Sequence, residues 1–180
     1  MATYKEIHGT VIETVTSDPS NPVNGQVWYN STDQVLKGFT SNPAGAWSTS
    51  GNLNTARKSL EGAGASNTAA IAFGGTANPP IYALTEIYNG SAWTEVADLN
   101  AGRSSMGAAG TSTAAIGFGG YNGTARVASN ETWNGSAWTE TTDMNTARSD
   151  IGAAIAGTSS NTQGAGGFST TYVAINESWN

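Results

Sequence analysis

The sequence predicts an all-β protein made of four-stranded antiparallel repeats of about 45 residues, preceded by an N-terminal arm. The first observation is a repeat: residues 86–103 recur almost unchanged at 131–148, with Asn-Gly-Ser-Ala-Trp-Thr-Glu in both. Trp47, Trp93 and Trp138 follow one another at 46 and 45 residues, so a degenerate unit precedes the clear ones. The second observation is that each unit has short segments of strand character separated by Gly, Asn and Ser, as in all-β repeats.

The composition predicts a polar but mostly uncharged surface and excludes several classes of partner. Charged residues make up 11% of the chain, against roughly 25% in ordinary globular proteins. The net charge of -6, with seven Lys and Arg, provides no basic stripe, so we expect neither a nucleic-acid partner nor binding to an anionic membrane. The absence of Cys removes disulfides, thiolate nucleophiles and cysteine metal ligands.

Residues 1–24 are interpreted as an N-terminal arm and linker. An alternating stretch at 8–16 predicts one strand, and the following run at 17–25, Ser-Asp-Pro-Ser-Asn-Pro-Val-Asn-Gly, is dense in turn formers. The N-terminus has no apolar run of signal-peptide length, and no stretch approaches a membrane span. We therefore expect synthesis in the cytoplasm, without a signal peptide and without membrane insertion.

Residues 25–53 are interpreted as a degenerate first repeat. Two aromatic and β-branched segments, 26–30 and 34–39, are separated by a short polar stretch and predict a hairpin. The second segment leads into Trp47 in the same way as the third strand of a complete repeat leads into its Trp.

Residues 54–180 are interpreted as the regular repeats, the last of them incomplete. Strands of the two full units are expected at 59–65, 68–73, 84–88, 92–96, 104–110, 113–118, 128–133 and 137–141. The Asn-Gly pairs at 89–90 and 134–135 fall between third and fourth strands, where a tight hairpin needs φ above zero. One more strand is expected at 173–179, and its unit is expected to lack a fourth strand because the sequence ends at Asn180.

Four features that recur in phase resemble the kelch repeat: a glycine doublet, an aromatic on the third strand, a Trp on the fourth, and an Arg after a short link. The residues are Gly74, Gly75, Gly119, Gly120 and, more loosely, Gly166 and Gly167; Tyr88, Trp133 and Trp179; Trp47, Trp93 and Trp138; and Arg57, Arg103 and Arg148. The resemblance covers roughly residues 34–180 and implies kelch-like β-propeller blades. The chain departs from the family in strands rich in Ala, Ser and Thr, and in Ala165, which stands where Phe118 stands.

A second resemblance concerns the front of the chain. The segment 25–37, Gly-Gln-Val-Trp-Tyr-Asn-Ser-Thr-Asp-Gln-Val-Leu-Lys, is similar to segments that precede fibre or adhesin repeats in virion structural proteins of tailed bacteriophages. The bias towards Gly, Ala, Ser and Thr resembles the same proteins. This resemblance rests on about a dozen residues and implies a protein located in the virion.

Arg57, Arg103 and Arg148 are equivalent in the repeat and allow two interpretations. Three arginines that converge on an axis could bind a carboxylate bidentately, as in sialidases. Alternatively, each pairs with a repeat-equivalent acid, Glu86, Glu131 or Glu177, or with backbone carbonyls between blades. We favour pairing, because a residue present in every repeat usually serves the packing of the repeat.

Trp93 and Trp138 could stack on sugars, but their strand position in every blade favours packing. His8 is the single histidine, so we expect no metal site and no cofactor. Asp98 and Asp143 are interpreted as turn residues, with a shallow calcium site as the alternative. No catalytic triad, carboxylate pair or phosphate loop can be assembled from these residues, so we expect no catalytic residues and no enzyme.

The loops that differ between repeats are the expected place of recognition, because they can change without disturbing the core. They are Thr76-Ala-Asn-Pro-Pro80, Tyr121-Asn-Gly-Thr-Ala-Arg126 and Phe168-Ser-Thr-Thr-Tyr172. We select Tyr121, Asn122 and Tyr172 as candidate binding residues.

Together these patterns predict a non-enzymatic bacteriophage structural protein, a tail or head fibre or appendage with kelch-like repeats. The arm is expected to dock onto other virion proteins, and the repeats to adhere to cell-surface carbohydrate of the host. The alternatives are a decoration or connector protein of the capsid or tail and, with less support, a cellular kelch scaffold. Propellers close with four to eight blades, so we expect a homo-oligomer, a longer parent chain, or closure at four blades by a strand from residues 8–16.

Overall fold

The computed structural model describes residues 6–7, 10–39, 47–154 and 157–180. Every regular element in these ranges is a β-strand, as predicted, and none is a helix. Fourteen of the strands form four separate sheets of three or four strands, and β1 (Glu6–Ile7) pairs with β2 (Thr10–Val11) in a two-stranded ribbon. The chain divides into two units, Met1–Ser48 and Thr49–Asn180, which are described separately.

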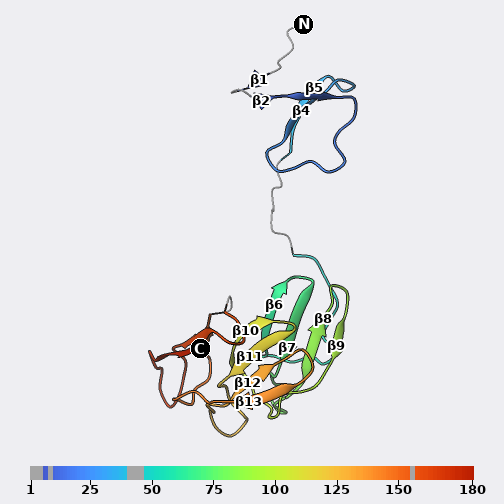
Figure 1. Cartoon of the computed structure of the whole chain (residues 1–180). Coiled ribbons are helices and arrows are strands. Elements are labelled where there is room, and N and C mark those ends of the chain that lie inside the picture. Colours follow the sequence, from blue (N-terminus) through green and yellow to red (C-terminus); the bar gives the residue numbers. More distant parts are fainter. Residues whose placement is uncertain (1–5, 8–9, 40–46, 155–156) are drawn as a thin grey trace. The chain divides into compact units, whose positions relative to one another are not determined.

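The N-terminal unit contains one three-stranded sheet (Figure 1). Its centre is β4 (Val27–Asn30), which pairs antiparallel with β5 (Val35–Gly38) and so confirms the predicted hairpin. The other neighbour of β4 is β3 (Glu13–Val15), in parallel. The idea that a strand from residues 8–16 completes the last repeat is therefore wrong, because the two described strands of that stretch pair with β1 and β4; His8 itself lies outside the described residues.

Asp18 holds this sheet together. Its Oδ1 accepts hydrogen bonds from Trp28 Nε1 at 3.0 Å and Asn30 Nδ2 at 2.8 Å, and its Oδ2 accepts one from Lys37 Nζ at 2.8 Å. The hydrogen bond from Lys37, with those from Asn30 and Trp28, lowers the pKa of Asp18 to about 2. Trp28, Asn30 and Lys37 belong to the motif at 25–37, so this motif builds the N-terminal sheet.

The C-terminal unit contains three sheets whose strands pair antiparallel in chain order (Figure 1). The first sheet consists of β6 (Glu61–Ser66), β7 (Ala69–Phe73), β8 (Thr85–Tyr88) and β9 (Trp93–Glu95). The second consists of β10 (Gly107–Thr111), β11 (Ala114–Phe118), β12 (Asn130–Trp133) and β13 (Trp138–Thr141). The third has β14 (Gly152–Ala153), β15 (Thr162–Ala165) and β16 (Asn176–Trp179). The four-stranded repeats are thus confirmed in the first two units.

The strands predicted at 59–65 and 104–110 begin two or three residues later in the structure. The reason is backbone conformation, because Ser59 and Ser105 have φ of 52° and 53°, which interrupts extended chain. The predicted Asn-Gly hairpins are confirmed: Gly90 and Gly135 have φ of 97° and 95°.

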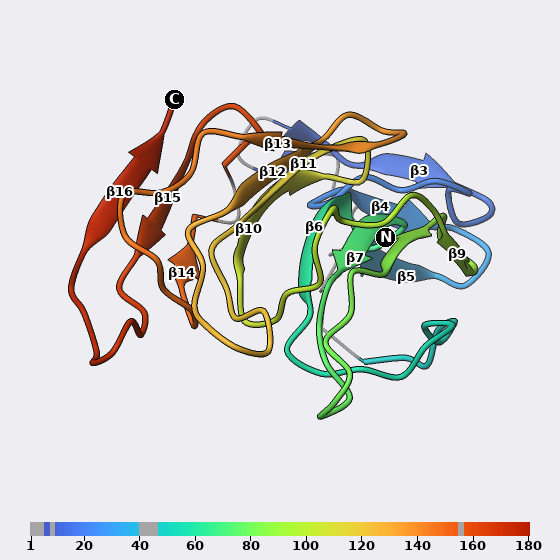
Figure 2. The same cartoon turned by 90° about the horizontal axis from the view of Figure 1, so that it is seen from below.

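Adjacent sheets of this unit are joined at their first strands. β10 lies beside both β6 and β14, and the second sheet lies between the first and the third (Figure 2). Ser105 N donates to Ser59 O at 3.0 Å, and Asp150 N donates to Ser105 O at 2.9 Å, so each sheet is bonded to the next at the same position.

Small side chains permit this close approach. Ala108, Ala109 and Ala115 are buried, and a Cβ on Gly117 would lie 2.7 Å from Cε2 of Phe73 in the preceding sheet. The Ala residues of these strands, which are part of the departure from the kelch pattern, therefore have a packing reason.

Candidate binding surface

The three repeat-equivalent arginines are buried in ion pairs. Arg103 Nη2 lies 2.7 Å from Glu131 Oε1, and the same pairing joins Arg57 to Glu86 and Arg148 to Glu177. The predicted pairing is confirmed. The alternative of a carboxylate site made by three arginines is wrong, because these side chains are inaccessible to a ligand.

Each glutamate carboxylate is held on both oxygens. Glu131 Oε2 accepts from Asn100 N and Nδ2, both at 2.8 Å, while Oε1 takes the arginine. Asn54 and Asn145 make the same backbone contact to their own glutamates. These asparagines were not predicted as partners, although an Asn stands three residues before each Arg in the sequence. Burial lowers the pKa of Arg103, while Glu131 opposes that shift.

The tryptophans differ in what they contact. Trp138 is 6% exposed; its ring lies 4.7 Å from Phe73 of the first sheet, and its Nε1 donates to Thr85 Oγ1 at 3.0 Å. It therefore packs one sheet against the next, as expected. Trp93 is half-buried beside Tyr88, whereas Trp47 is fully exposed and belongs to no strand.

The loops between second and third strands bring aromatic side chains together at one edge of the array. The guanidinium of Arg126 lies 5.9 Å from the ring centre of Tyr121 and 4.2 Å from that of Phe168. The Phe168 ring in turn meets Tyr172 edge to face at 5.3 Å. We call these four residues the aromatic loop cluster. It joins the variable loops of two successive repeats.

Two of the three residues selected from the sequence belong to this cluster. Tyr121 contacts Arg126, and Tyr172 is 89% exposed. Asn122 instead shapes its own loop, because its Oδ1 accepts from Thr124 N at 2.9 Å and Ala125 N at 2.8 Å. Arg126 and Phe168 were missed as site residues, although both stand at the ends of the variable loops.

A hollow of about 520 Å³ adjoins the cluster. It is lined by Asp150, Gly167, Phe168 and Tyr172. Asp150 is exposed and accepts a hydrogen bond from Ser149 Oγ at 2.8 Å. A carboxylate beside the exposed ring of Tyr172 and the half-buried ring of Phe168 offers an acceptor for hydroxyl groups and apolar faces for stacking. This combination suits a polyhydroxylated ligand.

Asp98, which the sequence analysis weighed as a calcium ligand, has a structural contact. Asp98 Oδ1 accepts from Thr85 N at 3.0 Å, as expected for a turn residue. Across the ranges that the structure describes, no three His, Cys, Asp or Glu side chains cluster as metal ligands would. None of the described segments is a helix long and apolar enough to cross a membrane.

Comparison with models of protein families finds no match, and comparison with curated proteins finds none either. The kelch and virion resemblances of the sequence therefore stay predictions.

Proposed function

We propose that this chain is a non-enzymatic structural protein of a tailed-bacteriophage virion that presents kelch-like propeller blades and adheres to carbohydrate on the host surface. The observation that carries the adhesion is the aromatic loop cluster, with Tyr172 projecting from it. The cluster lies on loops that differ between repeats, while the sheets beneath them are alike. Variation in loops on a constant scaffold is typical of recognition surfaces.

The way the sheets follow one another supports propeller blades. Blades surround an axis with their first strands innermost, and here β6, β10 and β14 lie side by side. The joint is repeated as well, because Gly75 N donates to Arg103 O and Gly120 N donates to Arg148 O, both at 2.8 Å. When similar sheets are joined by the same hydrogen bonds, each sheet is rotated by a similar angle relative to the one before it, and closure of a ring requires such a constant rotation.

The chemistry of the cluster favours a sugar over a protein or a nucleic acid. Phe168 and Tyr172 offer rings for the apolar faces of sugars, and Asp150 offers oxygen atoms to hydroxyl groups. Arg126 lies over the Phe168 ring, which orients the ring and adds hydrogen-bond donors. The chain has a net charge of -6, which disfavours phosphate-rich partners.

In this proposal the N-terminal unit attaches the protein to the particle. Its sheet is stabilised by Asp18 through contacts of its own, and it forms a unit distinct from the repeats. A small separate module at one end suits a role in docking onto other virion proteins. A connector protein that binds only virion partners is the second candidate, and the unpaired outer edge of β16 in the described chain favours it.

The test is a binding measurement of the purified chain to surface polysaccharides of candidate hosts by calorimetry. Tyr172→Ala removes an exposed ring without touching the core, and we expect it to weaken binding at least tenfold. Leu36→Ala removes an exposed side chain of the N-terminal unit and serves as the matched control. Equal affinity of the Tyr172→Ala variant and the unmodified chain would refute adhesion through this cluster and leave the connector.

A further inference from the structure

The third sheet offers an open strand position. In the second sheet β13 pairs with β12, with Trp133 opposite Trp138. Trp179 occupies the place of Trp133, because its Nε1 donates to Ser159 O at 3.1 Å as Trp133 Nε1 donates to Ser112 O at 3.1 Å. No strand in the described ranges pairs with the outer edge of β16.

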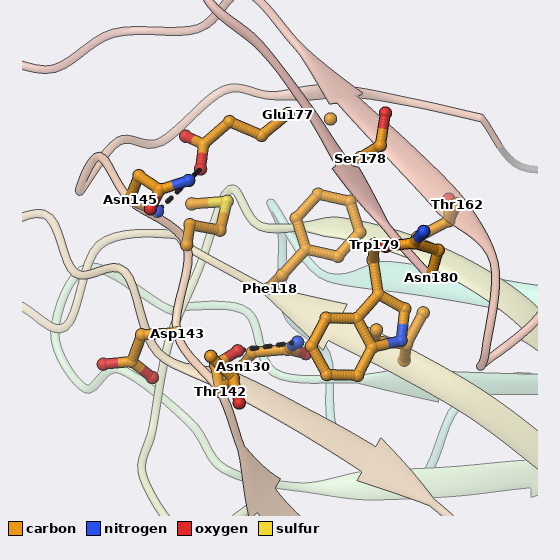
Figure 3. A pocket seen from close by; sticks show the side chains of 13 residues that line it. Phe118, Asn130, Thr142, Asp143, Asn145, Thr162, Glu177, Ser178, Trp179 and Asn180 are labelled. Carbon is orange, nitrogen blue, oxygen red and sulfur yellow. Dashed lines mark hydrogen bonds between the residues drawn. The ribbon is translucent and has the colours of Figure 1, made fainter.

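A cavity of about 380 Å³ lies where the Trp of a fourth strand would insert (Figure 3). It lies between the second and third sheets, and Phe118, Asn130 and Trp179 are among its lining residues. The equivalent residues around Trp138, one joint earlier, are Phe73, Thr85 and Trp133. The cavity therefore has the same three walls as the site that an indole already fills.

Asn130 supplies an independent sign of a missing ligand. Its side chain is buried, with 3% of the residue exposed, and its Nδ2 donates to Thr142 O at 3.2 Å. Its Oδ1 has no hydrogen-bond partner within the described structure. A buried acceptor without a donor costs free energy. At the equivalent position, Thr85 Oγ1 accepts the indole N–H of Trp138 at 3.0 Å.

We propose that Trp47 of a second copy of this chain fills the cavity, with residues 47–49 added as the fourth strand to β16. Ala46-Trp47-Ser-Thr resembles Ala92-Trp93-Thr-Glu, and Trp47 precedes Arg57 by the same 10 residues that separate Trp93 from Arg103. Trp47 is fully exposed and in no strand, so it is free to bind. By the register of β13, Trp47 lies opposite Trp179 and Ser48 opposite Ser178.

The chain's own Trp47 cannot reach this cavity. The Ser50 hydroxyl is hydrogen-bonded to the hydroxyl of Tyr88 in the first sheet. Trp47 is three residues from Ser50, and three residues span at most about 10 Å. Packed sheets lie about 10 Å apart, and the cavity lies on the far side of the second sheet. A second copy has no such restriction. The C-terminal units of two copies also bring together six sheets, within the four to eight that close propellers.

The first experiment is the mass in solution by light scattering over a range of concentrations. We expect a dimer, at twice 18.4 kDa, and a monomer of 18.4 kDa for Trp47→Ala, whose fold is unaffected because this side chain packs against nothing. Tyr172→Ala removes another exposed ring and should remain dimeric. A monomeric unmodified chain, or a dimer indifferent to Trp47→Ala, would overturn the proposal in favour of another occupant.

A cross-link tests the register. The chain has no Cys, so Ser48→Cys and Ser178→Cys can be made in separate preparations, mixed and oxidised. Paired strands place the two sulfurs within bonding distance, and we expect a covalent heterodimer. Ser160→Cys, which lies in an exposed turn, should not cross-link with Ser48→Cys. Equal cross-linking at both positions would contradict the register.

The unpaired Oδ1 of Asn130 allows a third test. Asn130→Thr introduces the residue found at position 85 and should preserve the dimer. Asn130→Val introduces a side chain with the shape of Thr but without its hydroxyl, and should raise the dissociation constant of the dimer about fivefold. Equal dissociation constants for the two variants would show that no indole donates there. None of these measurements involves carbohydrate, so dimerisation and adhesion can fail separately.

Discussion

The second and third sheets of the C-terminal unit contain the same ion pair in different surroundings. Arg103 and Glu131 are enclosed, with 2% of the Glu131 side chain exposed, whereas Glu177 is 14% exposed in its pair with Arg148. Both carboxylates also accept bonds from an asparagine, Asn100 or Asn145. The contacts are thus encoded within each repeat. Full burial depends on a fourth strand, which the second sheet has and the third lacks among the described residues.

The largest effect is expected from Trp138, which belongs to that fourth strand. Trp138→Ala removes the ring that packs on Phe73 and Trp133 and leaves a cavity, so the free energy of unfolding should fall by about 4 kcal/mol. Trp93→Ala, at the equivalent but half-buried position, should cost about 2 kcal/mol. Urea denaturation followed by circular dichroism measures both.

Equal losses for the two tryptophan variants would contradict this comparison. They would mean that the packing of Trp138 between the first and second sheets contributes no more to stability than the half-buried position of Trp93. Trp47→Ala is the reference for a Trp without packing and should leave the urea midpoint of the dilute monomer unchanged.

The ion pairs themselves give the second prediction. Glu131→Gln leaves Arg103 buried without a carboxylate and should lower the free energy of unfolding by about 3 kcal/mol. Glu177→Gln should cost about 1 kcal/mol, because water reaches its pair. Thermal unfolding at pH 7 distinguishes them. A larger loss for Glu177→Gln would show that burial does not set the strength of these pairs.

The pH dependence of the second variant sharpens the difference. Burial raises the pKa of Glu177, but hydrogen bonds from Arg148 and Asn145 outweigh it and lower the pKa below 4.5. A lowered carboxyl pKa stabilises the fold above the unfolded value, and this contribution is lost as the pH falls through the folded value. The gap between the unmodified chain and Glu177→Gln should therefore close below about pH 4.

Much of this architecture follows from the sequence, because it depends on local chemistry repeated in phase. Asn-Gly pairs need φ above zero, so the hairpins at 89–90 and 134–135 were predictable. The partners of the arginines were predictable because one acid recurs 28 or 29 residues after the Arg in each repeat. Periodicity thus fixes both the strands and the contacts within a repeat.

The features that the sequence did not predict arise between repeats or between distant segments. Arg126 and Phe168 come from different loops, and only the joint between sheets places them 4.2 Å apart. Asp18 lies outside the 25–37 motif that it holds, so nothing in the spacing identifies it as the centre of the N-terminal sheet. The cavity beside Asn130 is lined by residues of the second and third sheets, so no local sequence pattern predicts it.

The smallest effect concerns a side chain that breaks the repeat. Glu61 stands on β6 where the second and third sheets have Gly107 and Gly152. At Gly107 a Cβ would lie 2.3 Å from Cε2 of Phe118, so this position on the second sheet cannot take a side chain without repacking. Burial, with repulsion from Asp150, raises the pKa of Glu61 to about 7. The first sheet thus contains a carboxyl that titrates near neutrality.

A raised carboxyl pKa means that the folded chain binds a proton more tightly than the unfolded chain, whose Glu61 titrates near 4.5. The free energy of unfolding should therefore fall as the pH rises from 4.5 to 7, by about 1–2 kcal/mol after allowance for solvent screening of this half-buried group. Glu61→Gln should remove this slope and be the more stable protein at pH 8. Asp150→Asn removes only the smaller cause, so it should keep most of the slope. If the free energies of unfolding of the unmodified chain and Glu61→Gln change in parallel between pH 4.5 and 8, Glu61 is solvated. The first strand of the first sheet would then be as accessible to water as the edge of the third sheet.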